Sequence, residues 1–193
     1  MIGPVVLRGG HVVLEPLRAD HVDELVAAAS DGRLWELWYT SVPAPGAMAA
    51  AVDALLAEQA AGTRVPFVVR RTGGAVVGST TYLNIEADVP RLEIGSTWTA
   101  ASAQRSAVNT ESKLLLLTHA FEGLGCLAVE FRTHWHNRQS RAAIERLGAK
   151  QDGVLRNHRR LPDGSLRDTV VYSITDREWP AVRAGLLARL ARS

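Results

Sequence analysis

The stretch that decides the fold is LEIGSTWTAASAQRSAVN, residues 92–109. Its first part alternates apolar and polar residues as a strand does, and small residues then lead directly into an amphipathic segment that begins near Thr110. Unpaired amides and the positive end of the dipole at a helix start favour a phosphate or pyrophosphate group. The stretch therefore predicts an anion site, with the alternative that it is only a connecting loop with helix-capping chemistry.

Length and composition are typical of one globular domain. The 193 residues are 47% hydrophobic and 22% charged, no linker rich in Pro, Gly or Ser divides them, and we expect residues 1–193 to form a single domain. No apolar run approaches the roughly 20 residues that span a bilayer, and no export signal is recognisable. We expect a soluble cytoplasmic protein without membrane contact, in which the single Cys126 is a buried structural thiol.

The charge pattern does not indicate a nucleic-acid-binding surface. The formal net charge is only +2 and most basic residues are dispersed, so we expect no nucleic-acid partner. A basic cluster at residues 156–160 is interpreted as a solvated strand face. Its arginines, Arg156, Arg159 and Arg160, are alternatively placed to steer an anionic substrate or to meet a phosphate.

Hydrophobic periodicity and turn residues predict strands and helices along the whole chain. We expect strands at 5–17 with a turn or bulge at Gly9-Gly10, 66–71, 75–86, 91–99, 127–133, 154–161 and 166–174. Helices are expected at 21–29, 47–61, 110–123, 140–147 and 177–192, the last opened by a Thr175/Glu178 capping box. The three strands between 66 and 99 form an antiparallel meander, and the helical crossover after residue 99 allows a parallel pair.

This order of elements resembles the core of the GNAT acyltransferases, with one helix added at the C-terminus. Four short blocks carry the resemblance to the branch that contains the ribosomal-protein alanine acetyltransferases: Leu92–Gly95, Asn137-x-x-Ser140, Leu147–Ala149 and Asp168–Ser173. The resemblance implies an α/β (α+β) GNAT fold. In that fold a mixed, mostly antiparallel sheet of about seven strands is flanked by helices.

The resemblance also implies acetyl-CoA as the acyl donor and no metal. Gln104, Ala107 and Asn109 fill the places of the Gln/Arg-x-x-Gly-x-Gly/Ala turn that binds the coenzyme, with two departures from glycine that restrict the backbone. The backbone near Trp98 would hold the pantetheine arm as an added strand would be held. The residues expected to contact the donor are Trp98, Thr99, Gln104, Arg105, Ser106, Ala107, Val108, Asn109, Thr110 and Asn137.

Transfer to an amine needs a base for the amine and help for the leaving thiolate. Glu93 is the candidate base, because the strand pleat turns it away from the face of Leu92 and Ile94; an ordinary solvent-facing carboxylate is the alternative. The tyrosine that many GNAT enzymes carry seven residues after the asparagine is replaced by Ile144. Ser140 is therefore the candidate that assists the thiolate, with a helix cap as its alternative role.

Aromatic residues and histidines are expected to line the acceptor pocket. Trp35, Trp38 and Tyr39 would form its wall, and His134 would be a second candidate base, although aromatics in loops commonly just cover a core. His134 and His136 lie on opposite sides of an extended segment without further ligands at metal-site spacing, so we expect no metal.

The function expected from these residues is acetyl transfer from acetyl-CoA to a primary amine, by direct attack in a ternary complex. The acceptor would be a small molecule or a peptide N-terminus. Two alternatives stay open: a catalytically silent CoA-binding or regulatory domain, and a transferase for a larger acyl group such as succinyl. The C-terminal helix, with Leu186, Leu187 and Leu190 at helical spacing, would dock on its own core or form a homodimer seam, and the family resemblance favours the homodimer.

Overall fold

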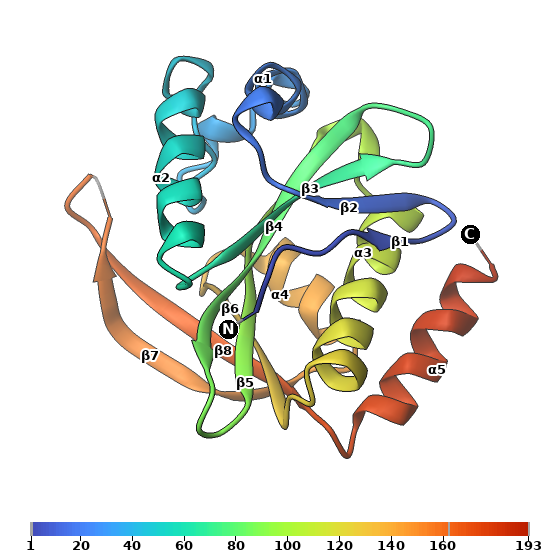
Figure 1. Cartoon of the computed structure of the whole chain (residues 1–193). Coiled ribbons are helices and arrows are strands. Elements are labelled where there is room, and N and C mark those ends of the chain that lie inside the picture. Colours follow the sequence, from blue (N-terminus) through green and yellow to red (C-terminus); the bar gives the residue numbers. More distant parts are fainter. Residues whose placement is uncertain (1, 162, 193) are drawn as a thin grey trace.

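The computed structural model describes residues 2–161 and 163–192, and over these residues the strands form one eight-stranded sheet (Figure 1). Its order is β1-β2-β3-β4-β5-β6-β8-β7, and every neighbouring pair is antiparallel except β5 and β6. The strands are β1 (Leu7–Arg8), β2 (Val12–Pro16), β3 (Val65–Arg71), β4 (Val76–Glu86), β5 (Arg91–Thr99), β6 (Ala128–His134), β7 (Lys150–Arg160) and β8 (Leu166–Thr175). The expected mixed, mostly antiparallel sheet is confirmed.

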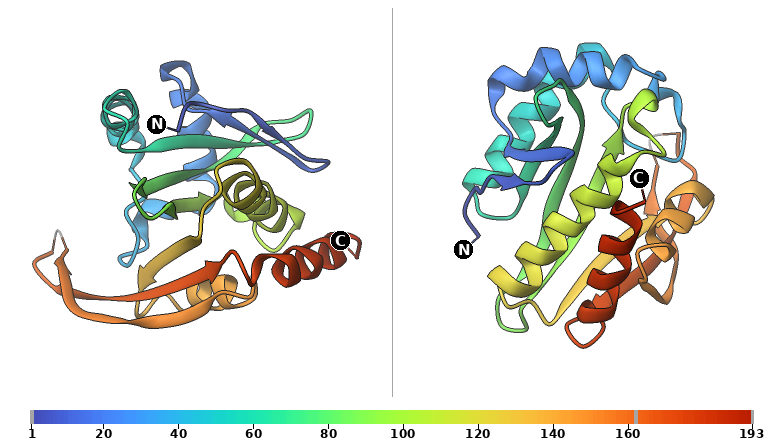
Figure 2. Two further views of the ribbon diagram at one scale, coloured as in Figure 1. Left: turned by 60° about the horizontal axis from the view of Figure 1, so that its bottom comes forward. Right: turned by 90° about the vertical axis from the view of Figure 1, so that its right-hand side faces the viewer.

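Helices cover both faces of this sheet (Figure 2). The α-helices are α1 (Val22–Ser30), α2 (Met48–Ala60), α3 (Ala107–Thr118), α4 (Arg138–Glu145) and α5 (Trp179–Leu190). In β3, Phe67 and Val69 pack into the core that α3, α4 and α5 share, whereas Val68 packs against α1 and α2. Alternate residues of one strand therefore bury both faces, which is why β3 reads as a nearly continuous apolar run.

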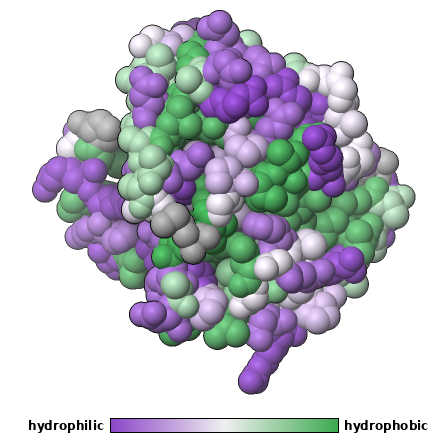
Figure 3. Space-filling model, viewed as in Figure 1, coloured by the Kyte–Doolittle hydropathy of each residue, from purple (hydrophilic) through white to green (hydrophobic). Residues whose placement is uncertain are grey.

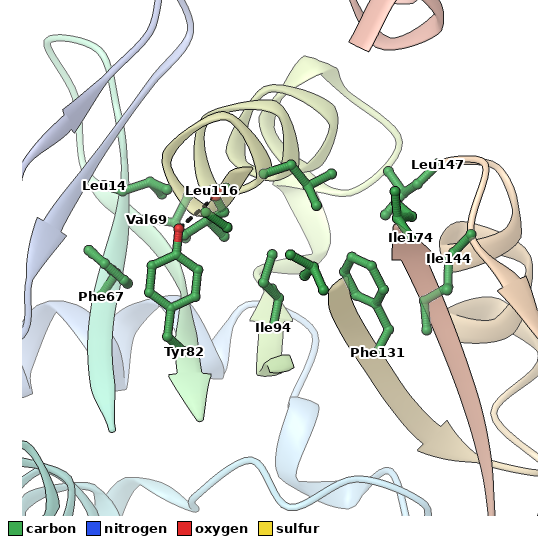
Figure 4. Packing of buried hydrophobic residues seen from close by; sticks show 14 of the residues in the cluster. Leu14, Phe67, Val69, Tyr82, Ile94, Leu116, Phe131, Ile144, Leu147 and Ile174 are labelled. Carbon is green, nitrogen blue, oxygen red and sulfur yellow. Dashed lines mark hydrogen bonds between the residues drawn. The ribbon is translucent and has the colours of Figure 1, made fainter. Parts of the chain in front are cut away.

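The core beneath α3 contains the most deeply buried side chains. Ile94 of β5 and Phe131 of β6 both point toward α3 in Figure 4, and the hydroxyl of Tyr82 donates a 2.7 Å hydrogen bond to the carbonyl of Leu116. That bond occupies a polar group that would otherwise be buried without a partner. The buried Cys126 lies in the same core, where burial raises the pKa of its thiol and keeps it protonated, as expected of a structural cysteine.

The two parallel strands separate after a short paired segment. Arg91, Leu92 and Glu93 of β5 pair with Ala128, Val129 and Glu130 of β6, and the described residues show no register between these strands beyond Glu93/Glu130. The rest of β5 continues to pair with β4 alone. We call the divergence of β5 and β6 beyond Glu93/Glu130 the wedge. Beyond Glu93, one edge of the β5 backbone therefore has no strand partner among the described residues.

A bulge deforms β5 just beyond the point of separation. Gly95 pairs with Thr81 and Trp98 pairs with Ser79, so two residues of β5, Ser96 and Thr97, stand opposite a single residue of β4. Ser96 adopts a positive φ of 49°. The bulge turns the backbone of β5 within the wedge, and no periodicity in the sequence indicates it.

Several expected boundaries were wrong. The strand expected at 5–17 spans only Leu7 to Pro16, whereas the turn expected at Gly9-Gly10 is confirmed and divides it into β1 and β2, so that the sheet has eight strands instead of about seven. The helix expected to begin near Thr110 begins at Ala107, because Ser106 caps it, and the helix expected from Ser140 begins at Arg138. β7 begins at Lys150, four residues before the expected start. Pro162, between the strands expected at 154–161 and 166–174, lies outside the described residues.

The C-terminal helix α5 docks on its own chain. Leu186 is 1% exposed in the core shared with α3, whereas Leu187 is 42% exposed. The indole of Trp179 donates a 2.8 Å hydrogen bond to Glu122 and stacks on Phe121. The expected Thr175/Glu178 box is half formed, because Glu178 accepts hydrogen bonds from Thr175 but is itself the N-cap residue. On the face seen in Figure 3, hydrophilic residues are spread over the surface and hydrophobic areas lie between them.

Candidate active site

The turn between β5 and α3 combines a side-chain cap with free helix amides. Ser106 is the N-cap: its hydroxyl accepts from the amide of Val108 at 3.4 Å and donates to the carbonyl of Ala103 at 2.6 Å. The left-handed residue of the turn is Arg105, with φ 56°, and not Ala107 or Asn109. The backbone at 107 and 109 does not require glycine, because both residues are helical. The first-turn amides of α3 remain directed out of the helix end, where an anion is favoured.

Thr110 is not part of this amide cradle. In a helix that begins at Ala107, the amide of the fourth residue bonds back to the carbonyl of the cap residue. The expectation that Thr110 stands at the helix start is therefore wrong. The first-turn amides are those of Ala107, Val108 and Asn109, and the amide of Val108 is already engaged by the cap Ser106. Both Ser106 and Thr110 are residue types that cap helices, so the sequence alone left this choice open.

A depression of about 380 Å³ lies between this turn and α4, lined by Gln104, Arg105, Gln139, Ala142 and Arg146. It presents two guanidinium groups, and among residues 2–161 and 163–192 neither Arg105 nor Arg146 forms an ion pair through its side chain. The side chain of Gln104 links the turn to α4. Its Nε2 donates to the carbonyl of Thr99 at 3.0 Å, and its Oε1 accepts from the side chain of Gln139 at 3.2 Å. Two unpaired cations beside a helix N-terminus suit phosphate groups.

Trp98 and Thr99 lie in the part of β5 that pairs only with β4. One edge of their backbone therefore faces the wedge, as expected for residues that would hold a pantetheine arm. The carbonyl of Thr99 already accepts a hydrogen bond from the side chain of Gln104, which joins this end of β5 to the turn before α3. The indole of Trp98 is half-buried against the hydrophobic clusters on both faces of the sheet.

Glu93 is the last paired residue before the wedge, and it is not the solvent-facing carboxylate of the alternative interpretation. It is 5% exposed, and its Oε2 accepts a 2.7 Å hydrogen bond from Asn84. Burial raises the pKa of Glu93, and the nearby guanidinium of Arg132, 3.5 Å from Oε2, opposes that rise. A raised pKa makes the carboxylate a stronger proton acceptor, which suits a general base.

The free oxygen of Glu93 is directed along its strand toward the wedge. A Cβ added at Gly95 would lie 2.8 Å from Oε1, so this oxygen rests against the glycine. Among the described residues no group donates a hydrogen bond to Oε1. Glycine at 95 thus leaves room for the carboxylate, and Oε1 is available to accept a proton.

Charged groups surround Glu93 on this face of the sheet. Glu130, its partner across the strand pair, is held by Arg91 and by Arg132, whose Nη2 lies 2.9 Å from Oε2. Arg159 and Arg167 stand opposite each other on β7 and β8, and desolvation first, then the charge of Arg159, lowers the pKa of Arg167. Within the basic cluster at residues 156–160, Arg156 pairs with Asp168 and Arg160 bonds the carbonyl of Gly164. The charge of Arg159 opposes the rise in the pKa of Glu93.

Asn137 and Ser140 lie at the start of α4, where Asn137 is the cap. Its side-chain oxygen accepts a 3.0 Å hydrogen bond from the amide of Ser140. The alternative in which Ser140 caps the helix is therefore wrong, because Ser140 is the third helical residue. No described group accepts from or donates to its hydroxyl, which leaves the hydroxyl free for another partner.

The structure brings three of the four expected acceptor-pocket residues together. Trp38 packs edge-to-face against Tyr39 and His134, with ring centroids 5.5 and 5.1 Å apart. Trp35 instead packs into the cluster under α1 and α2. The left-handed Arg33, with φ 49°, precedes a short 3-10 helix at Leu34–Glu36 that contains Trp35, whereas Trp38 follows that helix. Periodicity could not distinguish the two tryptophans, because this helix is only three residues long.

His134 is 3% exposed and lies on the same face of β6 as Glu130 and Arg132. Its Nδ1 accepts a 3.0 Å hydrogen bond from the amide of His136, so the neutral ring carries its proton on Nε2, and Nε2 is buried without a partner among the described residues. Burial lowers the pKa of His134 and keeps the ring neutral. This arrangement favours a hydrogen-bond donor over a base. No group of three His, Cys, Asp or Glu residues in the described ranges is arranged to hold a metal ion.

One buried group near the wedge was missed in the sequence. Lys113 of α3 is 6% exposed and donates a 2.9 Å hydrogen bond to Thr97 of the bulge. The signal was its spacing: Lys113 precedes the fully buried Leu116, Leu117 and Ala120 by three, four and seven residues, on the apolar stripe of the helix.

Residues 11–150 match the acetyltransferase (GNAT) domain family. A structure from T. thermophilus, provisionally described as an acetyltransferase, is 38% identical with a TM-score of 0.87, covering 98% of this chain and 99% of that chain. Mycobacterium smegmatis RimJ in complex with CoA-disulfide is 25% identical with a TM-score of 0.78, covering 97% and 93%. YdaF of Bacillus subtilis (strain 168), provisionally named a ribosomal N-acetyltransferase, is 31% identical over 106 residues, 55% of this chain.

The family match spans more than half of the chain, and the chain therefore belongs to the GNAT acetyltransferase family. The aligned region spans 57% of the length of YdaF. In the described part of the chain, none of the helices combines the length and the apolar character needed to cross a membrane.

Proposed function

We propose that this protein transfers an acetyl group from acetyl-CoA to a primary amine of a small molecule or a peptide, by direct attack in a ternary complex. The observation that carries the proposal is the end of pairing between β5 and β6 at Glu93/Glu130, directly before the turn with free helix amides. Family membership and the CoA-disulfide held by M. smegmatis RimJ support the same donor.

The residues of the site fit the donor. The amides of Ala107 and Asn109 with Arg105 and Arg146 would receive the phosphate groups, and the unpaired edge of β5 at Trp98 would receive the amides of the pantetheine arm. The side-chain nitrogen Nδ2 of Asn137 has no partner among the described residues, so it would donate to that arm or to a water.

Glu93 would accept the proton of the attacking amine, directly or through a water. Its free Oε1 beside Gly95 and its raised pKa support this role. The hydroxyl of Ser140 would donate a hydrogen bond to the departing sulfur. Trp38, Tyr39 and the Nε2–H group of His134 would line the pocket through which the acceptor amine enters.

The test is thiol release from acetyl-CoA in the presence of a panel of amines, with succinyl-CoA as the comparison donor. The proposal expects thiol release that requires both acetyl-CoA and an amine. CoA binding without thiol release for any amine would favour the silent-domain alternative, and a preference for succinyl-CoA would favour the larger acyl group.

A further inference from the structure

Lys113 is a cation placed where the fold would ordinarily bury an apolar side chain. It lies on the inner stripe of α3, and its ammonium reaches the hydroxyl of Thr97 at 2.9 Å and stands 6.0 Å from the ring centre of Phe131. Thr97 belongs to β5 and Phe131 to β6, both beyond the last paired residues. The ammonium therefore approaches the wedge from the α3 side.

The ammonium has few partners for a buried charge. A lysine has three N–H donors, and one hydrogen bond is found; none of the carboxylates in residues 2–161 and 163–192 pairs with it. Burial alone lowers the pKa of Lys113 to about 7. An amine of this kind gives up its proton readily near neutral pH, which an exposed lysine does not.

Other titratable groups near α3 are already engaged or face elsewhere. Glu111 on α3 accepts from three backbone amides of β2 and the turn before it. On the same face of the sheet, Tyr82 bonds the carbonyl of Leu116 and lies 3.4 Å from His119, and Tyr172 bonds Glu145 and Arg141 of α4. The charges of β5 and β6 project from the opposite face: Arg91, Glu93, Glu130 and Arg132.

The proposed path of acetyl-CoA brings its thioester close to Lys113. With the phosphates at the α3 turn, the pantetheine arm at Trp98 and the base at Glu93, the thioester has to lie between Trp98 and Glu93 along β5. Thr97, the partner of Lys113, occupies that interval. Glu93 and Lys113 then lie on opposite faces of the sheet, with the wedge between them. Glu93 is on the side of the attacking amine, and Lys113 is on the side of the sulfur.

We propose that Lys113 is the acid that protonates the departing thiolate of CoA; this inference rests on the proposed function. The amine nitrogen forms its bond to the carbonyl carbon, the carbon–sulfur bond breaks, and its electron pair stays on sulfur. Sulfur takes a proton from Nζ of Lys113 and leaves as the thiol, while the amine loses its own proton to Glu93. Solvent then restores the proton to Lys113 and removes the one on Glu93. Ile144, at the position of the missing tyrosine, cannot supply this proton.

The chain contains only two lysines, Lys113 and Lys150, which allows a matched experiment. Lys150 is exposed and pairs with Glu178, so Lys150→Met is the control for Lys113→Met. We expect Lys113→Met to bind CoA within a few-fold of wild type in calorimetry but to lose about 10²- to 10⁴-fold in kcat, the usual contribution of a general acid. Lys113→Arg should stay slow, because a guanidinium keeps its charge but does not release a proton.

The pH profile separates a proton donor from a structural residue. In wild type, kcat should fall as pH rises through the pKa of Lys113, since the deprotonated amine cannot serve as the acid. Lys113→Met should lack this fall. Three results would each overturn the proposal. They are a wild-type kcat in Lys113→Met, a full rescue of kcat by Lys113→Arg, and an alkaline fall in kcat that persists unchanged in Lys113→Met. Thiol release by wild type keeps these outcomes distinct from failure of the proposed function.

A measurement on the wild-type protein does not depend on any variant. Carbon NMR of the two lysine Cε positions should show one resonance that titrates near neutral pH and moves when CoA is added, and a second, from Lys150, that does neither. A Lys113 resonance indifferent to bound CoA would place the sulfur elsewhere and refute the assignment.

Discussion

At the scale of single residues, the account depends on Glu93 as a buried carboxylate with one free oxygen. Burial raises its pKa, whereas Asn84 and Arg132 engage only Oε2. Because a base has to be ionised, activity should rise as pH rises through this elevated pKa and should be lost as pH falls below it.

Glu93→Gln should reduce kcat/KM by about a hundredfold or more and should remove this acid limb of the pH profile. The neutral amide still offers Asn84 an acceptor, so the free energy of unfolding should change by no more than about 1 kcal/mol. Glu86→Gln, an exposed carboxylate at the end of β4, is the matched control. Steady-state kinetics across pH provide the measurement, and an active Glu93→Gln with the acid limb intact would show that Glu93 is only an ion-pair partner.

At the scale of elements, the β5–α3 turn and α4 together shape the depression that we propose receives the phosphates. Arg146→Glu reverses the charge of one of its two cations, and we expect KM for acetyl-CoA to rise about tenfold, since a charge-assisted hydrogen bond is worth about 1.5–3 kcal/mol. Acetyl-pantetheine lacks the phosphates and should be used equally well by both proteins. Equal KM values for acetyl-CoA would mean that the phosphates lie outside this depression.

Another element-scale contact holds the N-terminal hairpin to α3. Glu111 is 8% exposed and accepts from the amides of Gly10, His11 and Val12 at 2.9, 2.7 and 2.7 Å. Glu111→Ala should lower the free energy of unfolding by about 3 kcal/mol, because three amides lose a charged acceptor at once. Urea unfolding should show a lower midpoint with an unchanged slope, whereas the exposed Asp53→Ala on α2 should stay near wild type. A loss below about 1 kcal/mol would mean that water replaces the carboxylate.

Element types were predictable, but their ends depended on competition between neighbouring residues. Ser106 and Thr110 are both capping types, and so are Asn137 and Ser140; in each pair the earlier residue is the cap. The bulge at Ser96 depends on how β5 pairs with β4. A local sequence pattern in β5 does not report this pairing with another segment of the chain. Resemblance identified Glu93 and the phosphate turn, but it was silent on Lys113, Asn84 and Arg132.

At the scale of the whole molecule, the crossover through α3 determines where chemistry can occur. It makes β5 and β6 the parallel pair in an otherwise antiparallel sheet, and their pairing ends at Glu93/Glu130 (Figures 1 and 2). The sequence predicted this crossover because a strand, a helix and a strand follow one another there. The position of Lys113 against Thr97 was not predictable, because it depends on how α3 packs over two strands that have already separated.

The most direct measurement of the central claim is a crystal structure of the protein with CoA. We expect the diphosphate at the amides of Ala107 and Asn109, the pantetheine arm along the free edge of β5 at Trp98, and the sulfur within hydrogen-bond reach of Lys113. A coenzyme bound elsewhere, with β5 and β6 closed on each other by side chains beyond Glu93/Glu130, would contradict it.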